Sequence, residues 1–373
     1  FTQTSDQRVK DFAWDAKLSK QPPTADDLRV RDIARNALCS IFRRHGAEET
    51  QRPLLLPRSS YYTAPNIVQL LDGTGNLLQL PYDLVLPHAR RLAKHEPAVE
   101  RTFVFGNVYR DTLSGGPPRN IKEVDFDIVT KESDDLVLQE AEVLKVIDEI
   151  VDEIPALSSQ PMCFHLNHSD LLELILDFCR IDKSQRPVVK ETLSKLNIHQ
   201  FGWSKIRAEL RSPLIGIHST SLDDLAQFDF RDTPEKALKK LQDILEGSTH
   251  ISRIRRPMEH IKRVIDAMKL FGIRRKIYIC PLSSFNEKFY TGSVLFQCIS
   301  QLVEGTTDSL TPTALAPMPQ AKRATLSASA SAGTVSSPQS SDTGRIQSAV
   351  HTSRRDMKNY SVRHGTPNAA TSW

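Results

Sequence analysis

The sequence predicts an α+β fold, with an antiparallel sheet flanked by helices, a helical insertion and a disordered C-terminal tail. Residues 101–130 hold two β-rich runs separated by the breaker Gly115–Pro118, which is typical of a hairpin with a long loop. From Asp182 to about Thr249 the pattern of apolar residues changes to that of short helices. Beyond Glu304 the composition shifts to Ser, Thr, Ala and Pro. Such a tail buries too little apolar surface to offset its ordering entropy. The expected domains are a core in two parts, 1–181 and 251–303, a helical insertion domain, 182–250, and a disordered low-complexity tail, 304–373.

The first helix and the strand after it are predicted from apolar spacing and from breakers. Apolar residues repeat at helical spacing from Asp26 to His45, and Gly46 ends the run, so we expect a core-facing helix. Glu49–Pro57 is extended, and Pro53 confines it to a sheet edge or a subunit boundary. The other expected elements are strands at 77–80, 163–167, 277–281 and 286–297, and helices at 81–93, 136–151, 171–181 and 258–271.

The hairpin places polar side chains where a ligand could reach them. Its first arm brings Tyr109 and Arg110 to the mouth of the loop, and Arg119 stands at the other end of that loop. On the second arm, Asp125 and Asp127 share one face. Arginines beside carboxylates suit a ligand with both phosphate and amine groups. The hairpin pattern alone fits a solvated surface hairpin equally well.

Four stretches of the chain resemble one enzyme family in the right order, over residues 6 to about 303. The run Val108-Tyr109-Arg110-Asp111, followed by Asp125-Phe126-Asp127-Ile128, resembles motif 2 of histidyl-tRNA synthetases. The helix, Gly46 and the strand with Pro53 resemble motif 1, the dimer interface of class II aminoacyl-tRNA synthetases. Residues 81–84 and 289–292 are similar to the family's Leu-Arg-Tyr-Asp-Leu and histidine-binding motifs. The resemblance is strongest to the synthetase-like regulatory domain of the general-control kinase, which phosphorylates translation initiation factor two during amino-acid starvation.

This resemblance implies a degenerate ligand pocket. In the family, the acid at the place of Asp83 receives the α-amino group of the substrate, and the arginine at the place of Arg110 holds the ATP α-phosphate. Tyr290 and Asp127 stand where the family contacts the histidine imidazole. The residues assigned to the pocket are Asp83, Arg110, Arg119, Asp127 and Tyr290.

The same resemblance shows what is missing for catalysis. Phe285 stands at the family's catalytic arginine, Ile121 and Glu123 replace the hairpin Phe and Gln, and Pro81 replaces an arginine. Nothing in the sequence matches the Gly-Gly-Arg-Tyr-Asp of motif 3. An insertion, a splice variant or a mispredicted reading frame would each explain its absence. Loss of one electrostatic contact commonly costs on the order of 10² to 10³ in rate. We therefore expect no catalytic residues, no cofactor, and loss of ATP and histidine binding.

The partners implied by the resemblance are uncharged tRNA, a second copy of the chain and an attached protein kinase, with the ribosome as a further candidate. Neither a Gly-rich ATP loop with its lysine nor a His-Arg-Asp loop occurs in the sequence, so kinase activity would belong to a part of the protein ahead of Phe1. Basic residues of the insertion are scattered among acids, so solvated helices remain an alternative there. A genuine histidine–tRNA ligase with a damaged sequence and a scaffold paralogue also remain open. The residues expected to bind tRNA are Tyr109, Arg110, Arg119, Arg253, Arg255, Arg256, Arg274, Arg275 and Lys276.

The composition of the chain limits which partners, metals and compartments are expected. The net charge of +4 lies in the tail, because the chain from Gly305 onward has seven basic and three acidic residues, which leaves 42 of each in the body. Bulk charge therefore gives no argument for nucleic acid. The five cysteines are far apart in apolar runs, as expected of reduced, buried thiols. His165 and His168 lack further ligands nearby, so we expect no metal site. No apolar run reaches the roughly 18 residues of a membrane helix, and we expect a cytoplasmic protein without membrane contact.

Overall fold

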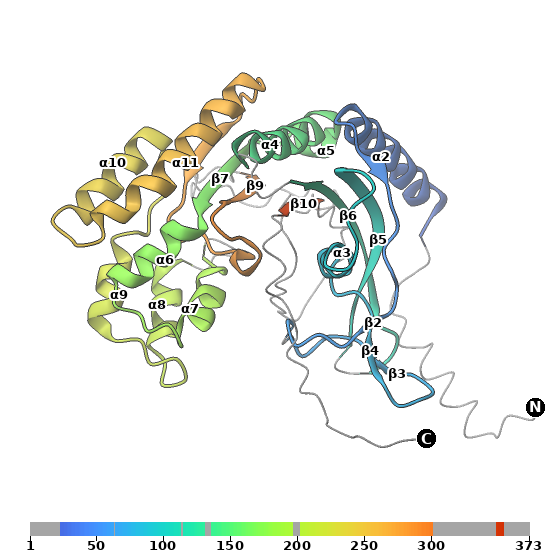
Figure 1. Cartoon of the computed structure of the whole chain (residues 1–373), viewed down its shortest axis with the longest axis horizontal. Coiled ribbons are helices and arrows are strands. Elements are labelled where there is room, and N and C mark those ends of the chain that lie inside the picture. The colour runs from blue at the N-terminus through green and yellow to red at the C-terminus, as the bar shows by residue number, and fades with distance from the viewer. Residues whose placement is uncertain are drawn as a thin grey trace, which may run out of the picture.

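A computed structural model describes residues 23–62, 64–112, 115–130, 136–196, 202–300 and 348–353, the last of these as backbone alone. Figure 1 shows two lobes. One holds the long hairpin of β5 (Arg101–Arg110) and β6 (Arg119–Val129) with helices α2 (Ala25–Arg44) and α3 (Val85–Leu92), and the other holds the helices from α6 (Ser169–Phe178) to α11 (Ile251–Leu270). Helix α4 (Leu136–Glu153) lies along the top and connects them. The described elements are α-helical and β-stranded as expected, and the regular elements of the described part of 182–250 are helices.

The hairpin forms the centre of the first sheet, as the sequence predicts. β5 and β6 pair antiparallel, with Arg110 opposite Arg119 at the loop end. β1 is a parallel edge strand on β5, and β10 lies parallel to β6 on the other side. β10 falls inside the segment expected to be disordered, where no strand is predicted; the rest of that tail lies outside the described residues. The strands in spatial order are β1 (Glu48–Glu49), β5 (Arg101–Arg110), β6 (Arg119–Val129) and β10 (Ser348–Ser353).

The other described strands form two smaller sheets. In one, β7 is central, with β8 parallel and β9 antiparallel to it. The expected strand 286–297 is wrong in its first half: Asn286 has a left-handed φ of 57° and starts a 3₁₀ turn, Glu287–Phe289, before β9 begins at Val294. The bounds are β7 (Met162–His168), β8 (Lys276–Ile279) and β9 (Val294–Ser300), and in the other sheet β2 (Leu56–Pro57), β4 (Leu77–Gln79) and β3 (Gln69–Leu71).

Helix α2 (Ala25–Arg44) departs from the expected core-facing helix. Thr24 and Asp27 form a capping box at its start, and Gly46 follows its end with φ 72°, as the sequence predicts. Only the C-terminal half enters the core, where Phe42 stacks on the aromatic residues of the hairpin. In the N-terminal half, apolar side chains are open to solvent: Leu28 is 49%, Val30 64% and Ile33 63% exposed, and Val30 and Ile33, three residues apart, share one face.

The other helices line the core and build the second lobe. Helix α11 begins seven residues earlier than the sequence predicts, because the helix continues through Pro257, with Ile254 and Met258 buried on either side of it. This places Arg253, Arg255 and Arg256 on a helix. No helix in the described part of the chain has the length and apolar character to cross a membrane. The helices are α3 (Val85–Leu92), α4 (Leu136–Glu153), α5 (Pro155–Ser158), α6 (Ser169–Phe178), α7 (Arg186–Leu193), α8 (Trp203–Arg211), α9 (Ser219–Ala226), α10 (Pro234–Leu245) and α11 (Ile251–Leu270).

Candidate functional site

Asp83 is held at the start of helix α3 by contacts on both of its oxygens. The segment before α3 packs closely on β5 because Gly106 has no side chain: a Cβ there would lie 2.5 Å from Leu84 Cδ2. Asp83 Oδ1 accepts a hydrogen bond from the Leu86 amide at 2.9 Å, and the Tyr62 hydroxyl donates to Oδ2. The side chain is buried. Asp83 therefore orders the first turn of α3 in addition to any role towards a ligand.

Arg110 lies close to Asp83, but it is turned into the protein. Its Nη1 donates to the Tyr82 carbonyl at 2.5 Å and to the Tyr109 carbonyl at 3.0 Å. The guanidinium also lies 3.5 Å from the centre of the Tyr82 ring, a cation–π contact. Arg119, opposite Arg110 in the hairpin, is exposed. Of the two arginines at the loop, only Arg119 is positioned to meet a large ligand.

Asp127 belongs to a buried ion pair that the sequence did not indicate. Arg52 Nη2 lies 2.6 Å from Asp127 Oδ2, and the two side chains are 3% and 1% exposed. His88 of α3 lies 3.8 Å from the same oxygen. Arg52 and His88 carry no motif, so only their positions in the fold could have identified them. The pair joins the extended segment between β1 and β2 to the open end of the hairpin, away from its loop.

Asp125, on the same strand as Asp127, has no described ion pair to offset the cost of its burial. Neither of its carboxylate oxygens has a hydrogen-bond partner within the described residues, and the side chain is fully buried. Burial raises the pKa of Asp125 well above its ordinary value, and the negative charge of Asp127 raises it further. The Arg52 charge opposes this shift. The surroundings of Asp125 therefore favour its neutral form.

Tyr290 lies on a different element, just after the 3₁₀ turn, beside a buried chain of polar groups. Its ring meets Phe296 edge-on at 6.2 Å. Burial, and then the charge of Glu140, raise the pKa of its hydroxyl. Glu140 Oε2 lies 3.0 Å from His260 Nε2, and His260 Nδ1 lies 3.0 Å from His168 Nε2. Burial lowers the pKa of His168 to about 3, with the His260 charge contributing, so this chain is neutral at His168.

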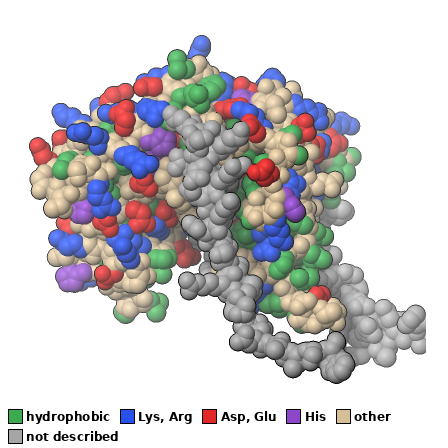
Figure 2. Space-filling model, in the orientation of Figure 1, with side chains coloured by type: hydrophobic (Ala, Val, Ile, Leu, Met, Phe, Trp, Pro, Cys, Tyr) green, Lys and Arg blue, Asp and Glu red, His purple; other side chains and the backbone are tan. Residues whose placement is uncertain are grey.

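The residues expected to bind tRNA do not form one patch. Two basic groups stand at opposite ends of α11, whose 20 residues span about 30 Å, and the hairpin arginines lie in the other lobe (Figure 1). Arg253 is exposed but ion-paired to Asp177 at 2.7 Å. Figure 2 shows Lys and Arg side chains among Asp and Glu across the helical lobe. The exposed members of the two groups without a described ion pair are Arg255, Arg256, Arg274 and Lys276.

The structure changes the interpretation of Arg275, which is among the residues that the sequence analysis expects to bind tRNA. Its guanidinium pairs with Asp148 and Asp152 of α4, and Nη1 donates to the Asp148 carbonyl at 3.0 Å. These contacts tie the start of β8 to α4. Because both of its Nη atoms are engaged by α4, Arg275 has a structural role and is a weaker candidate for a phosphate contact than Arg274 and Lys276.

Two of the replaced family positions also have structural roles in this chain. Ile121 packs against the buried cluster of Leu84, Val104 and Val108, and Phe285 is half-buried. Within the residues that the structure describes, no group of three or more His, Cys, Asp or Glu side chains could hold a metal ion. The cysteines are free thiols, and burial raises the pKa of Cys163 to about 11.

The fold is shared with known structures. It matches an ATP phosphoribosyltransferase regulatory subunit/histidyl-tRNA synthetase from Bacillus halodurans with a TM-score of 0.60 at 14% identity, covering 77% of this chain and 72% of that one. A histidyl-tRNA synthetase from Nostoc sp. PCC 7120 gives 0.59 at 16% identity, covering 80% and 64%. The architecture is therefore that of the class II histidyl-tRNA synthetases. No family model matches the sequence.

Sequence similarity identifies a smaller group within the proteins that share this fold. The chain is 37% identical over 301 residues to the eIF-2-alpha kinase GCN2 of Schizosaccharomyces pombe, covering 79% of this chain and 19% of the kinase. It is 26% identical to human GCN2, covering 72% and 16%, and 24% identical to the cytoplasmic histidine–tRNA ligase of Arabidopsis thaliana, covering 74% and 31%. The chain thus spans about a fifth or less of the length of these kinases. It is a histidyl-tRNA synthetase-like region of the GCN2 type, and the similarity favours this over a genuine histidine–tRNA ligase.

Proposed function

We propose that this domain binds uncharged tRNA without aminoacylating it, and that it regulates a protein kinase attached to it in the amino-acid starvation response. The observation that carries the proposal is the match to GCN2 kinases over 79% of the chain, combined with a former ligand pocket whose charges are engaged internally. Binding would shift an equilibrium between two arrangements of the domain and the kinase. The compartment consistent with this role is the cytoplasm.

The absence of catalysis is supported by the residues at the pocket. Arg110 is stacked on Tyr82 and bonded to carbonyls, so it would have to move before it could hold a phosphate. Ile121 lies in an apolar cluster where an adenine-stacking ring would be required. Phosphoryl and acyl transfer depend on cations aimed at developing charge. With Phe285 in place of a further arginine, these losses act together rather than one at a time.

Binding of tRNA is supported by the spread of the exposed cations. Arg255 and Arg256 lie in the second turn of α11, and Arg274 and Lys276 lie beyond its other end, so about 20 Å of helix separates the two groups, and Arg119 lies in the other lobe. A small ligand could reach only one of these groups. A folded RNA could lie across all of them, with its acceptor end near the hairpin, and phosphate contacts carry no sequence requirement.

The experiment is a fluorescence-anisotropy titration of uncharged tRNA at several salt concentrations. The variant Arg255→Ala/Arg256→Ala/Arg274→Ala should weaken binding at least tenfold and flatten the salt dependence, by roughly 0.7 to 0.9 in slope for each lost phosphate contact. A matched control replaces Arg58, Arg91 and Lys94, which are exposed elsewhere. Arg119→Ala tests the hairpin separately. Unchanged affinity in the α11 triple variant, or an affinity indifferent to salt, would contradict the proposal.

We further propose a homodimer through the open face of α2. Leu28, Val30 and Ile33 are exposed on this helix, and Leu54 and Leu55, just before β2, are 55% and 51% exposed. An apolar patch that is solvated in a monomer is costly and commonly marks an interface. The segment containing Leu54 and Leu55 also follows the edge strand β1, which leaves its outer side unpaired in the described sheet.

A further inference from the structure

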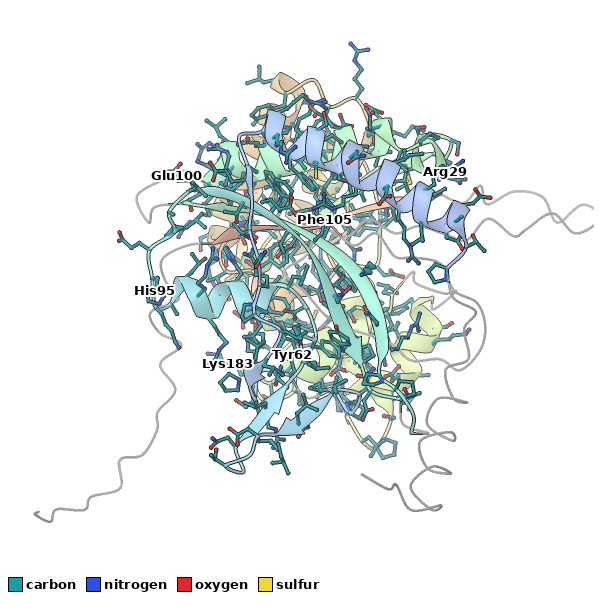
Figure 3. All side chains as sticks on the ribbon, turned by 90° about the vertical axis from the view of Figure 1, so that its right-hand side faces the viewer. Arg29, Tyr62, His95, Glu100, Phe105 and Lys183 are labelled. Atoms are coloured by element: carbon teal, nitrogen blue, oxygen red, sulfur yellow. The ribbon has the colours of Figure 1, made fainter. Side chains whose placement is uncertain are left out.

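Lys288 reaches over a group of aromatic rings beneath helix α3. Its ammonium nitrogen lies 5.1 Å from the centre of the Tyr61 ring, 5.2 Å from that of Tyr62 and 5.0 Å from that of Phe289. Each distance is within the roughly 6 Å at which a ring face attracts a cation. Figure 3 shows Tyr62 within the dense group of side chains at the foot of the hairpin lobe. One ammonium therefore contacts three rings that come from two distant parts of the sequence.

The rings are fixed relative to one another, so they form a preorganised box. Tyr61 and Tyr62 are perpendicular with centres 5.7 Å apart, and Tyr61 lies 5.3 Å from Phe289 at 48°. Tyr62 is itself backed by Tyr82 at 5.4 Å. The Tyr61 hydroxyl donates to the Lys288 carbonyl at 3.0 Å, which ties the 3₁₀ turn to the box. The geometry does not depend on the lysine side chain, because these ring contacts and this hydrogen bond involve other atoms.

The electrostatics of the box favour a positive charge. Tyr62, which forms one wall, donates its hydroxyl to Asp83, so a carboxylate lies at the hydroxyl end of this ring. Burial lowers the pKa of Lys288, while the charges of Asp83 and Glu191 raise it. No ion pair of Lys288 occurs within the described residues. The ammonium is thus held by rings and by a carboxylate at longer range, which is how quaternary and primary ammonium ligands are recognised.

We propose that Tyr61, Tyr62 and Phe289 form an ammonium-binding site that Lys288 of the same chain occupies, and that this occupancy closes the site to amino acids and other primary amines. The site is distinct from the tRNA contacts proposed above and does not depend on them. It also places the chain's own ammonium where the charge of the buried carboxylate Asp83 acts on it.

The lysine can be removed without disturbing the turn that carries it. Lys288 as a whole residue keeps an exposed surface, and the described hydrogen bond to Tyr61 uses its backbone carbonyl and not its side chain. Replacement by alanine deletes the ammonium and most of the stem. An exogenous alkylammonium of similar length, such as n-propylammonium, should then fill the space left.

The test is a titration of the full chain with n-propylammonium chloride and with histidine, followed by tyrosine fluorescence and NMR. Lys288→Ala should bind n-propylammonium with millimolar affinity, at least tenfold more tightly than the unchanged chain and than the control Lys183→Ala, which alters an exposed lysine outside the box. A second substitution, Lys288→Ala/Phe289→Leu, should lose that gain. Sodium chloride at equal concentration controls for ionic strength.

Two results would overturn the proposal. One is a folded Lys288→Ala chain that binds alkylammonium no better than the unchanged chain. The other needs no variant of the lysine: in the unchanged chain the ε-methylene protons of Lys288 should be shifted upfield by the rings, and they should return towards the usual lysine position in Phe289→Leu. An unshifted resonance in the unchanged chain would show that Lys288 does not occupy the box.

Discussion

Charged side chains near helix α3 and charged side chains on the outer surface have different partners. Near α3, Arg110 lies over the Tyr82 ring and bonds to carbonyls, and Asp127 is paired with Arg52, so these charges have partners within the chain. On α11, by contrast, Arg255 and Arg256 are exposed without a described ion pair. Charges that are satisfied internally stabilise a fold, whereas exposed cations remain available to an anionic partner.

Under the proposed function, this contrast separates side chains that hold the fold together from side chains that a partner could contact. A pocket that binds substrates must leave donors and acceptors open for them. Here the residues at those positions hold the hairpin, α3 and the 3₁₀ turn together. A large ligand would instead contact the widely spaced cations of the surface.

The largest effect on stability should follow from breaking the buried ion pair between Arg52 and Asp127. Arg52→Ala leaves Asp127 without its cation in a buried setting, and we expect a loss of about 3 to 5 kcal/mol in the free energy of unfolding. Arg255→Ala, which removes an exposed arginine, should change stability by no more than about 0.5 kcal/mol. Urea unfolding followed by circular dichroism measures both. If the two variants were equally stable, the pocket would not be held by its own charges.

A smaller and pH-dependent effect is expected at Asp125. Its folded-state pKa is raised, so its contribution to stability is complete below the unfolded pKa of about 3.9 and is lost as pH rises towards the folded value. Asp125→Asn should therefore gain stability over the unchanged chain as pH rises from 4 to 8, by about 1 to 3 kcal/mol. Asp127→Asn is the matched control, because that carboxylate has a cation and should show no such gain. A pH-independent difference for Asp125→Asn would argue that the carboxylate finds a partner.

The third effect concerns assembly on the open face of α2. Ile33→Arg puts a charge into the apolar patch and should weaken self-association at least tenfold, because burying an unpaired charge is strongly unfavourable. Sedimentation velocity at tens of micromolar measures the dimer fraction. Leu214→Arg serves as control, since Leu214 is 96% exposed in the other lobe. A chain that is already monomeric at this concentration before any substitution would rule out the dimer.

The sequence predicted local features well and long-range partners poorly. The hairpin, the Gly46 cap and the helical insertion follow from turn residues and apolar spacing, which act over a few residues. The exposed half of α2 was missed because apolar spacing identifies an apolar face without saying what covers it. Arg52 and Lys288 were missed because their partners are 75 or more residues away in the chain. Arg275 was misassigned because a run of basic residues does not reveal the acids of α4 that neutralise one of them.

The central claim, that the pocket performs no chemistry, is tested most directly by histidine-dependent ATP–pyrophosphate exchange on the purified chain. This reaction requires ATP, histidine and the catalytic cations together. The account predicts a rate at background for the unchanged chain and for Phe285→Arg, because restoring one cation leaves Ile121 and the internally engaged Arg110 in place. An exchange rate well above background, abolished by Asp83→Ala, would contradict the account and identify the protein as a working histidine–tRNA ligase.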